Sequence, residues 1–67
     1  MSTTLSRTEI ENLINEWVLS QRDRELMKRR LIDGICIEPL SEEFALSPRQ
    51  VHRIVKKNTL KLQERGL

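Results

Sequence analysis

Residues 34–57 constrain the fold most, because they hold two amphipathic segments separated by a connection of only a few residues. In the first segment Leu40 and Phe44 are four residues apart, so a helix places both on one face. The second segment carries a matching apolar stripe, formed by Val51, Ile54 and Val55. Two short helices that bury these stripes against each other are the simplest solution.

The connection between the two segments is a sharp corner with a clear start signal for the second helix. Ala45, Leu46 and Ser47 leave room only for a tight turn. Ser47 supplies a side-chain oxygen to cap the next helix, and Pro48 suits the first helical position, where a missing N–H is harmless. The pattern predicts helices at about 37–44 and 48–64, joined as a helix-turn-helix at about 37–57. In such a unit the second helix can lie in the DNA major groove.

Charge is unevenly distributed along the chain. Residues 1–46 hold six Lys/Arg against nine Asp/Glu, a balance of −3, whereas residues 47–67 hold six against one, a balance of +5. A basic helix on a mildly acidic body is typical of a nucleic-acid binder. The alternative is an ordinary solvated surface helix, because Lys and Arg are common on any helix.

At this point the sequence resembles a known family. Eight residues match, in register, the helix-turn-helix of region four of bacterial sigma factors and of related small phage and bacterial regulators: Gly34, Ile35, Leu40, Phe44, Leu46, Ser47, Val51 and Ile54. The preceding segments 22–26 and 29–34 resemble the helix that leads into this motif, so about two-thirds of the chain is covered. Ala45 stands where the family has Gly at the corner, so a left-handed backbone there would be strained and the turn is expected to differ slightly.

The exposed side of the second helix supplies the candidate DNA contacts. Arg49 and Arg53 suit bidentate contact with guanine, and Gln50 suits adenine. Lys56 and Lys57 are better placed to neutralise phosphates, which adds affinity without sequence information. The full set of candidate DNA-binding residues, including the start of the helix and a lower-ranked histidine, is Ser47, Pro48, Arg49, Gln50, His52, Arg53, Lys56 and Lys57.

The N-terminal half predicts two platform helices, at about 8–19 and 21–32. Ser6 and Glu9 fit a capping box, Ser20 fits the second cap, and Gly34 is expected to end the second helix in a left-handed conformation. Trp17 lies on the apolar stripe of the first helix, so core packing is favoured over a base-stacking role. Pairs with nearby acids are likewise favoured over phosphate contacts for the arginines of the second helix. We therefore expect one all-α domain over 1–67 with four helices, a C-terminal helix-turn-helix and a flexible segment at 1–7.

The remaining residues argue against several function classes. No nucleophile with a paired base, phosphate loop or metal-ligand cluster is present, so we expect no catalysis, no cofactor and no metal. The lone Cys36 is expected to be a small apolar filler in a reduced, cytoplasmic protein. No apolar run approaches the length of a membrane span.

Two expectations about partners remain open beside double-stranded DNA. Region four of sigma factors also binds RNA polymerase, so the resemblance allows a protein-interaction module that binds polymerase or another partner. Homodimers are a further expectation, because one recognition helix covers few base pairs. In this alternative an apolar docking or dimerisation surface would include Leu60, Leu62 and Leu67.

Overall fold

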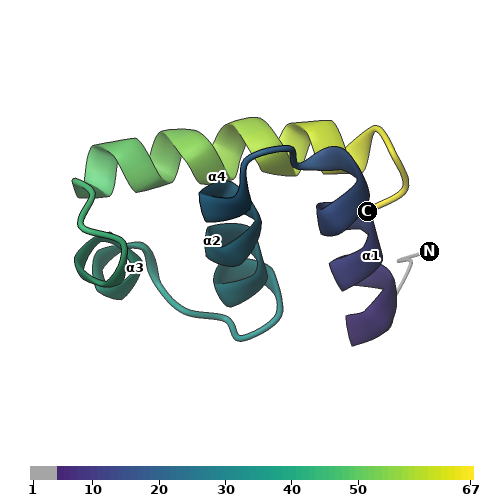
Figure 1. Ribbon diagram of the computed structural model, residues 1–67, viewed down its shortest axis with the longest axis horizontal. Helices are drawn as coiled ribbons and strands as arrows, with labels where there is room; N and C mark the ends of the chain where they lie inside the picture. The colour runs from purple at the N-terminus through teal and green to yellow at the C-terminus, as the bar shows by residue number, and fades with distance from the viewer. Residues whose placement is uncertain (1–4) are drawn as a thin grey trace.

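The computed structural model describes residues 5–67, and those residues form four helices and no strand (Figure 1). The helices are α1 (Arg7–Trp17), α2 (Gln21–Leu31), α3 (Ile37–Glu43) and α4 (Pro48–Gln63). The long α4 runs along one side of the molecule, and the three shorter helices lie beneath it, with α3 under its beginning and α1 under its end. Both α1 and α3 contact α2 and α4, so α2 and α4 hold the two ends together. The expected all-α, four-helix architecture is confirmed.

Serine residues start three of the four helices, as the sequence predicts. Ser6 Oγ accepts from Glu9 N–H, and Glu9 Oε1 accepts from Ser6 N–H at 2.9 Å, which completes the capping box of α1. Ser20 caps α2 by accepting from Asp23 N–H. Ser47 caps α4 with Pro48 directly after it. These oxygens satisfy N–H groups that have no partner within the helix.

The cap of α3 differs from the expectation for Cys36. This residue is the N-cap of α3, is exposed, and makes no capping hydrogen bond through its side chain. Its interpretation as a buried apolar filler is therefore wrong. The reason is its position outside the first turn, where the side chain faces water rather than the apolar face of α3.

The apolar residues form two clusters, one at each end of the molecule. The α1-side cluster consists of Ile14, Val18, Met27 and Leu62, which are all buried. The α3-side cluster consists of Leu26, Leu40 and Val51, each with no exposed surface. Leu26 and Met27, which are adjacent on α2, therefore belong to different clusters. The half-buried Val55 packs against both clusters.

The helix ends differ from the sequence-based bounds by one or two residues. α1 ends at Trp17 rather than Leu19, because Val18 adopts an extended backbone that turns its side chain into the core. Gly34 has φ +72°, the left-handed conformation expected after α2. Of the segment expected to be flexible, residues 1–4 lie outside the described residues, whereas Ser6 and Arg7 are the cap and first residue of α1.

The C-terminal end of α4 packs more closely than its polar residues suggest. Asn58 is buried, and its Nδ2 donates to the carbonyl of Ile54 at 2.9 Å, so the amide has a partner inside the helix. After α4 the chain turns back, and Leu67 N–H donates to the carbonyl of Leu62 at 3.0 Å. The Arg65 guanidinium lies 4.1 Å from the ring centroid of Trp17, a cation–π contact between the C-terminal turn and α1.

No helix in residues 5–67 combines the length and apolar character needed to span a bilayer.

Candidate nucleic-acid interface

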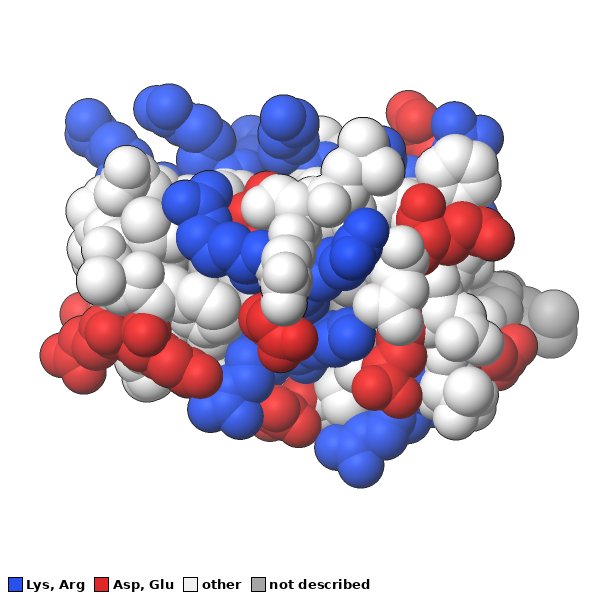
Figure 2. All heavy atoms as spheres, in the orientation of Figure 1, with Lys and Arg blue, Asp and Glu red and all other residues white. Residues whose placement is uncertain are grey.

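One long side of α4 is basic and faces away from the core. The helix has 16 residues, so it is about 24 Å long. Its buried residues Val51, Asn58 and Leu62 point toward the other helices. At 100° per residue, Arg49, Arg53 and Lys56 fall on the opposite side. In Figure 2 a row of Lys and Arg side chains stands along the edge of the molecule that α4 forms.

All eight candidate DNA-binding residues are exposed. Among residues 5–67, no carboxylate lies within ion-pair distance of Arg49, Arg53, Lys56 or Lys57. Their charges are therefore neutralised only by solvent ions in the free protein, and the energetic cost of transferring them to a phosphate backbone is small.

Two candidates have structural roles at the start of α4. Ser47 Oγ accepts from Gln50 N–H at 3.2 Å, and Gln50 Oε1 accepts from Ser47 N–H at 3.0 Å, which forms a second capping box. Bidentate contact with adenine needs both the oxygen and the nitrogen of a glutamine amide. Gln50 can make that contact only after its cap opens, so its side chain is less available than those of Arg49 and Arg53.

The arginines of α2 are used within the protein. Arg22 pairs with Asp23 at 3.3 Å, and Arg29 bridges Asp33 at 3.3 Å and Glu43 at 3.0 Å. The hydrogen bond and charge of Glu43 raise the pKa of Arg29. Arg24 Nε donates to the carbonyl of Val18 at the α1–α2 connection. The expectation that surface pairs, rather than free cations, dominate here is confirmed for Arg22 and Arg29.

Acidic side chains gather on α3, away from the basic side of α4. Glu38, Glu42 and Glu43 belong to this helix and are exposed. Figure 2 shows negative charge at the end of the molecule where α3 lies, on the side away from α4. The chain therefore presents opposite charges on two different surfaces rather than a uniform mixture.

The corner between α3 and α4 contains the one non-glycine residue with positive φ among residues 5–67. Ala45 has φ +56° and is exposed. The following N–H, of Leu46, donates to the carbonyl of Ser41 at 2.9 Å, which closes the end of α3. The turn thus keeps the left-handed geometry that glycine favours, so the expectation that the turn would differ is wrong. An alanine in this conformation is expected to be strained.

The apolar docking surface expected from Leu60, Leu62 and Leu67 is not formed. Leu62 is completely buried in the α1-side cluster, and Leu67 folds back onto the same cluster. Leu60 alone remains outside, with 54% of its surface exposed. The expectation fails because Leu62 lies on the buried face of α4 with Val51 and Asn58, and the turn after Gln63 returns Leu67 to the core.

A groove between α2 and α4 is the feature that the sequence did not predict. It has a volume of about 480 Å³ and reaches from the start of α3 to Leu60. The one sequence signal for it is Arg30, a cation within the apolar face of α2. Within the described part of the chain, no group of three or more His, Cys, Asp or Glu side chains could hold a metal ion.

Comparison with known proteins gives no relative: no family model, no curated protein and no solved structure matches this chain.

Proposed function

We propose that this protein is a sequence-specific DNA-binding transcriptional regulator of the helix-turn-helix type. In this proposal α3, the corner and α4 form a unit like that of sigma factor region four, and the first half of α4 lies in the major groove of double-stranded DNA. The observation that carries the proposal is the unpaired basic side of α4, directly after a tight corner and opposite the buried stripe of the same helix.

The roles of the side chains follow from their positions on α4. Arg49 and Arg53 lie near its N-terminal end, the part that reaches base edges in this docking geometry. Each is expected to contribute about 1–3 kcal/mol of discrimination when it pairs with a guanine. Lys56 and Lys57 lie farther along the helix and neutralise phosphates, while His52 flanks the contact. Binding of this kind needs neither metal nor cofactor and assigns the chain no catalytic role.

Opposite charge on the two surfaces supports one docking orientation. The basic side of α4 attracts the phosphate backbone, whereas Glu38 and Glu42 on α3 repel it. DNA is therefore disfavoured from approaching the acidic surface of α3. RNA polymerase as a partner and homodimer formation stay predictions. The loss of Leu62 and Leu67 to the core removes the surface first expected to serve them.

Fluorescence anisotropy with duplexes selected from a random pool tests the proposal. The double substitution Arg49→Gln, Arg53→Gln is expected to reduce binding to the selected duplex by at least about tenfold more than binding to random duplexes. Lys56→Gln is expected to weaken both equally and to lower the slope of log K against log salt by about one.

The matched control removes two cations elsewhere. Lys28→Gln, Lys61→Gln changes the net charge by the same amount but leaves the outer side of α4 intact, so it should keep the preference for the selected duplex. An equal loss of preference in the two double variants would contradict the assignment. Failure of the wild-type chain to bind any duplex below about 100 µM in low salt would end the proposal itself.

A further inference from the structure

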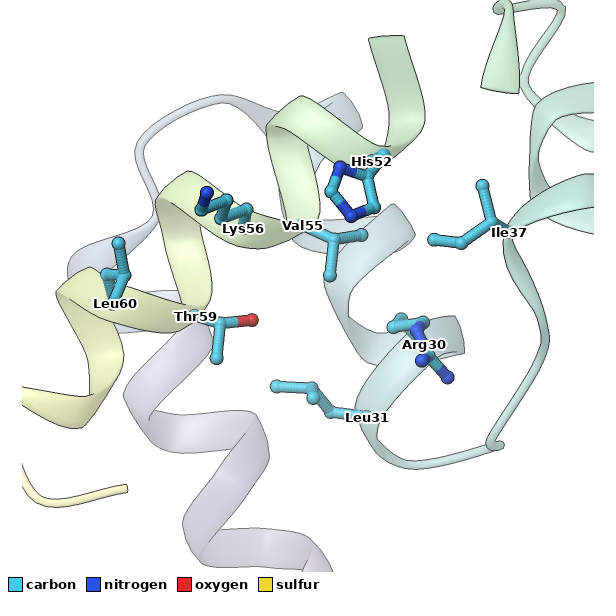
Figure 3. A pocket seen from close by; sticks show the side chains of 8 residues that line it. All are labelled: Arg30, Leu31, Ile37, His52, Val55, Lys56, Thr59 and Leu60. Atoms are coloured by element: carbon cyan, nitrogen blue, oxygen red, sulfur yellow. The ribbon is translucent and has the colours of Figure 1, made fainter. Parts of the chain in front are cut away.

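The groove between α2 and α4 is lined by both apolar and basic side chains (Figure 3). Four apolar side chains line it: Leu31, Ile37, Val55 and Leu60. Arg30 comes from α2, and His52, Lys56 and Thr59 come from one side of α4. In Figure 3 the side chains surround an open space, and the Thr59 hydroxyl points into it.

The lining has cationic groups and no carboxylate. Arg30 is half-buried, and its NH1 donates to the carbonyl of Ile35 at 3.4 Å, a long bond that leaves its other N–H groups available. Across residues 5–67, neither Arg30 nor Lys56 has an acidic partner within 4.0 Å. A partly desolvated guanidinium without a counter-ion favours binding of an anion.

A second groove provides a comparison, because its acidic and basic side chains are balanced. It has a volume of about 320 Å³ beside α1 and α2, and its charged side chains are three carboxylates and three cations: Glu11, Glu25, Asp33, Arg7, Lys28 and Arg29. Arg7 and Arg29 both pair with Asp33. That groove is therefore charge-balanced, whereas the groove of Arg30 has cationic side chains and no carboxylate.

The size of the groove indicates a small molecule rather than a protein. Small-molecule sites typically have volumes of about 300–1,000 Å³, are largely apolar and hold a few convergent polar groups. A stable protein interface needs about 800 Å² from each partner. The groove has only eight lining residues, and the whole molecule has 4,813 Å² of accessible surface. Its size therefore fits a small-molecule site better than a protein interface.

We propose that this groove binds a small organic anion with an apolar body, such as an arylalkyl carboxylate. The apolar body packs against Leu31, Ile37 and Val55. The carboxylate accepts hydrogen bonds from Arg30 and from Lys56 or His52. Charge and shape thus select the same ligand class.

Binding of this anion regulates DNA binding, a consequence that rests on the function proposed above. Lys56 and His52 belong both to the groove and to the basic side of α4. A bound carboxylate engages Lys56 and places negative charge beside the DNA phosphates. The anion therefore lowers DNA affinity, and DNA lowers the affinity for the anion by the same factor.

Titration of the whole ¹⁵N-labelled chain, without DNA, tests the site. The probes are 4-phenylbutyrate, its uncharged amide and 4-phenylbutylamine, which share one apolar body and differ in charge. We expect 4-phenylbutyrate to bind saturably with a Kd below about 1 mM and to shift the amide signals of the groove residues. The uncharged amide should bind at least about fivefold more weakly, because a charge-assisted hydrogen bond is lost, and the amine more weakly still.

Two exposed or half-exposed lysines of α4 provide matched variants. Lys56→Gln removes a charge that lines the groove and should weaken binding of 4-phenylbutyrate by about fivefold. Lys61→Gln removes the same charge outside the groove and should change the Kd by less than about twofold. Equal affinity for the three probes, signals that shift on another face, no saturation in the millimolar range, or equal effects of the two variants would overturn the proposed site.

A second measurement separates the anion site from the DNA-binding function. With a selected duplex, saturating 4-phenylbutyrate should reduce DNA affinity by about fivefold or more, and the amide should have less effect. If the probe binds the groove but no duplex binds the chain, the site stands and the proposed function fails. If duplex binds with unchanged affinity while the groove is occupied, the regulatory coupling is wrong.

Discussion

At the scale of single residues, two helices are followed by a residue with a left-handed backbone. This conformation is free of strain for one of the two residues and costs conformational energy for the other. Gly34 has φ +72°, and a Cβ added there would meet nothing within 4 Å, so glycine serves only the backbone conformation. Ala45 has φ +56° with its Cβ present. A left-handed residue other than glycine costs about 1–2 kcal/mol, so the corner before α4 holds strain that Gly34 avoids.

Replacing Ala45 by glycine should relieve this strain. Part of the gain is offset by the greater freedom of glycine in the unfolded chain, so we expect Ala45→Gly to raise the free energy of unfolding by about 0.5–1 kcal/mol. In a domain of this size the melting temperature should rise by about 3–6 °C, measured by circular dichroism. Gly34→Ala is the reverse control and should lower it. A lower melting temperature for Ala45→Gly would show that Ala45 is not strained.

At the scale of elements, the capping box of α1 links helix formation to pH. Glu9 Oε1 accepts from Ser6 N–H at 2.9 Å, and this backbone hydrogen bond, followed by the Ser6 side chain, holds the pKa of Glu9 below its ordinary 4.5. The ionised carboxylate also interacts favourably with the positive end of the helix dipole. The start of α1 is therefore more stable when Glu9 is charged.

The sign of the pH effect follows from the lowered pKa. The contribution of Glu9 is fully present above its unfolded pKa and is lost as the pH falls through the lower folded value. Glu9→Gln keeps an acceptor oxygen but cannot ionise. Thermal unfolding at about pH 7 should show the wild type to be more stable than Glu9→Gln, and the difference should shrink steadily as the pH falls through the folded pKa of Glu9. A difference that persists in acid would exclude the carboxylate as its source.

At the scale of the whole molecule, two small clusters must act as one core. Leu26 and Met27 on α2 belong to different clusters, and Val55 on α4 packs against both. A chain of 67 residues has a stability of only about 3–5 kcal/mol, too little for two independent units. We therefore expect the ends of the molecule to unfold together.

Leu26→Ala tests this coupling from one end to the other. The substitution should lower the free energy of unfolding by about 2–5 kcal/mol, because Leu26 is completely buried. Trp17 is the only tryptophan and lies beside the other cluster, so its fluorescence reports on the far end. Its urea midpoint should fall together with the midpoint of helical circular dichroism. A Trp17 midpoint that stays at the wild-type value would mean that the clusters unfold separately.

The sequence predicted the helices well because each has a local start or stop signal. Ser6, Ser20, Ser47 and Gly34 act within a few residues of their own position, and the apolar stripes of α1 and α4 have helical spacing throughout. Exposure of Arg49 and Arg53 followed from that spacing alone. Helix ends and exposed positions that depend on residues close in sequence could thus be predicted from the sequence.

Features that depend on tertiary contacts were missed. Leu67 packs against the α1-side cluster because the chain turns back after α4, and no local signal marks that return. The capping box of Ser47 and Gln50 was missed for a different reason, because its two residues are only three positions apart and match the local capping-box pattern. The groove of Arg30, by contrast, exists only where α2 meets α4. Such contacts join residues distant in sequence, so periodicity and capping rules do not reach them.

The separation of a buried apolar side and an exposed basic side on α4 has an evolutionary consequence. Arg49, His52, Arg53, Lys56 and Lys57 are exposed, and none of their side chains forms a hydrogen bond within residues 5–67. Surface substitutions of this kind change stability by no more than about 0.5 kcal/mol. Under the proposed DNA-binding function, single substitutions along this side can therefore change the target preference without compensating changes in the interior.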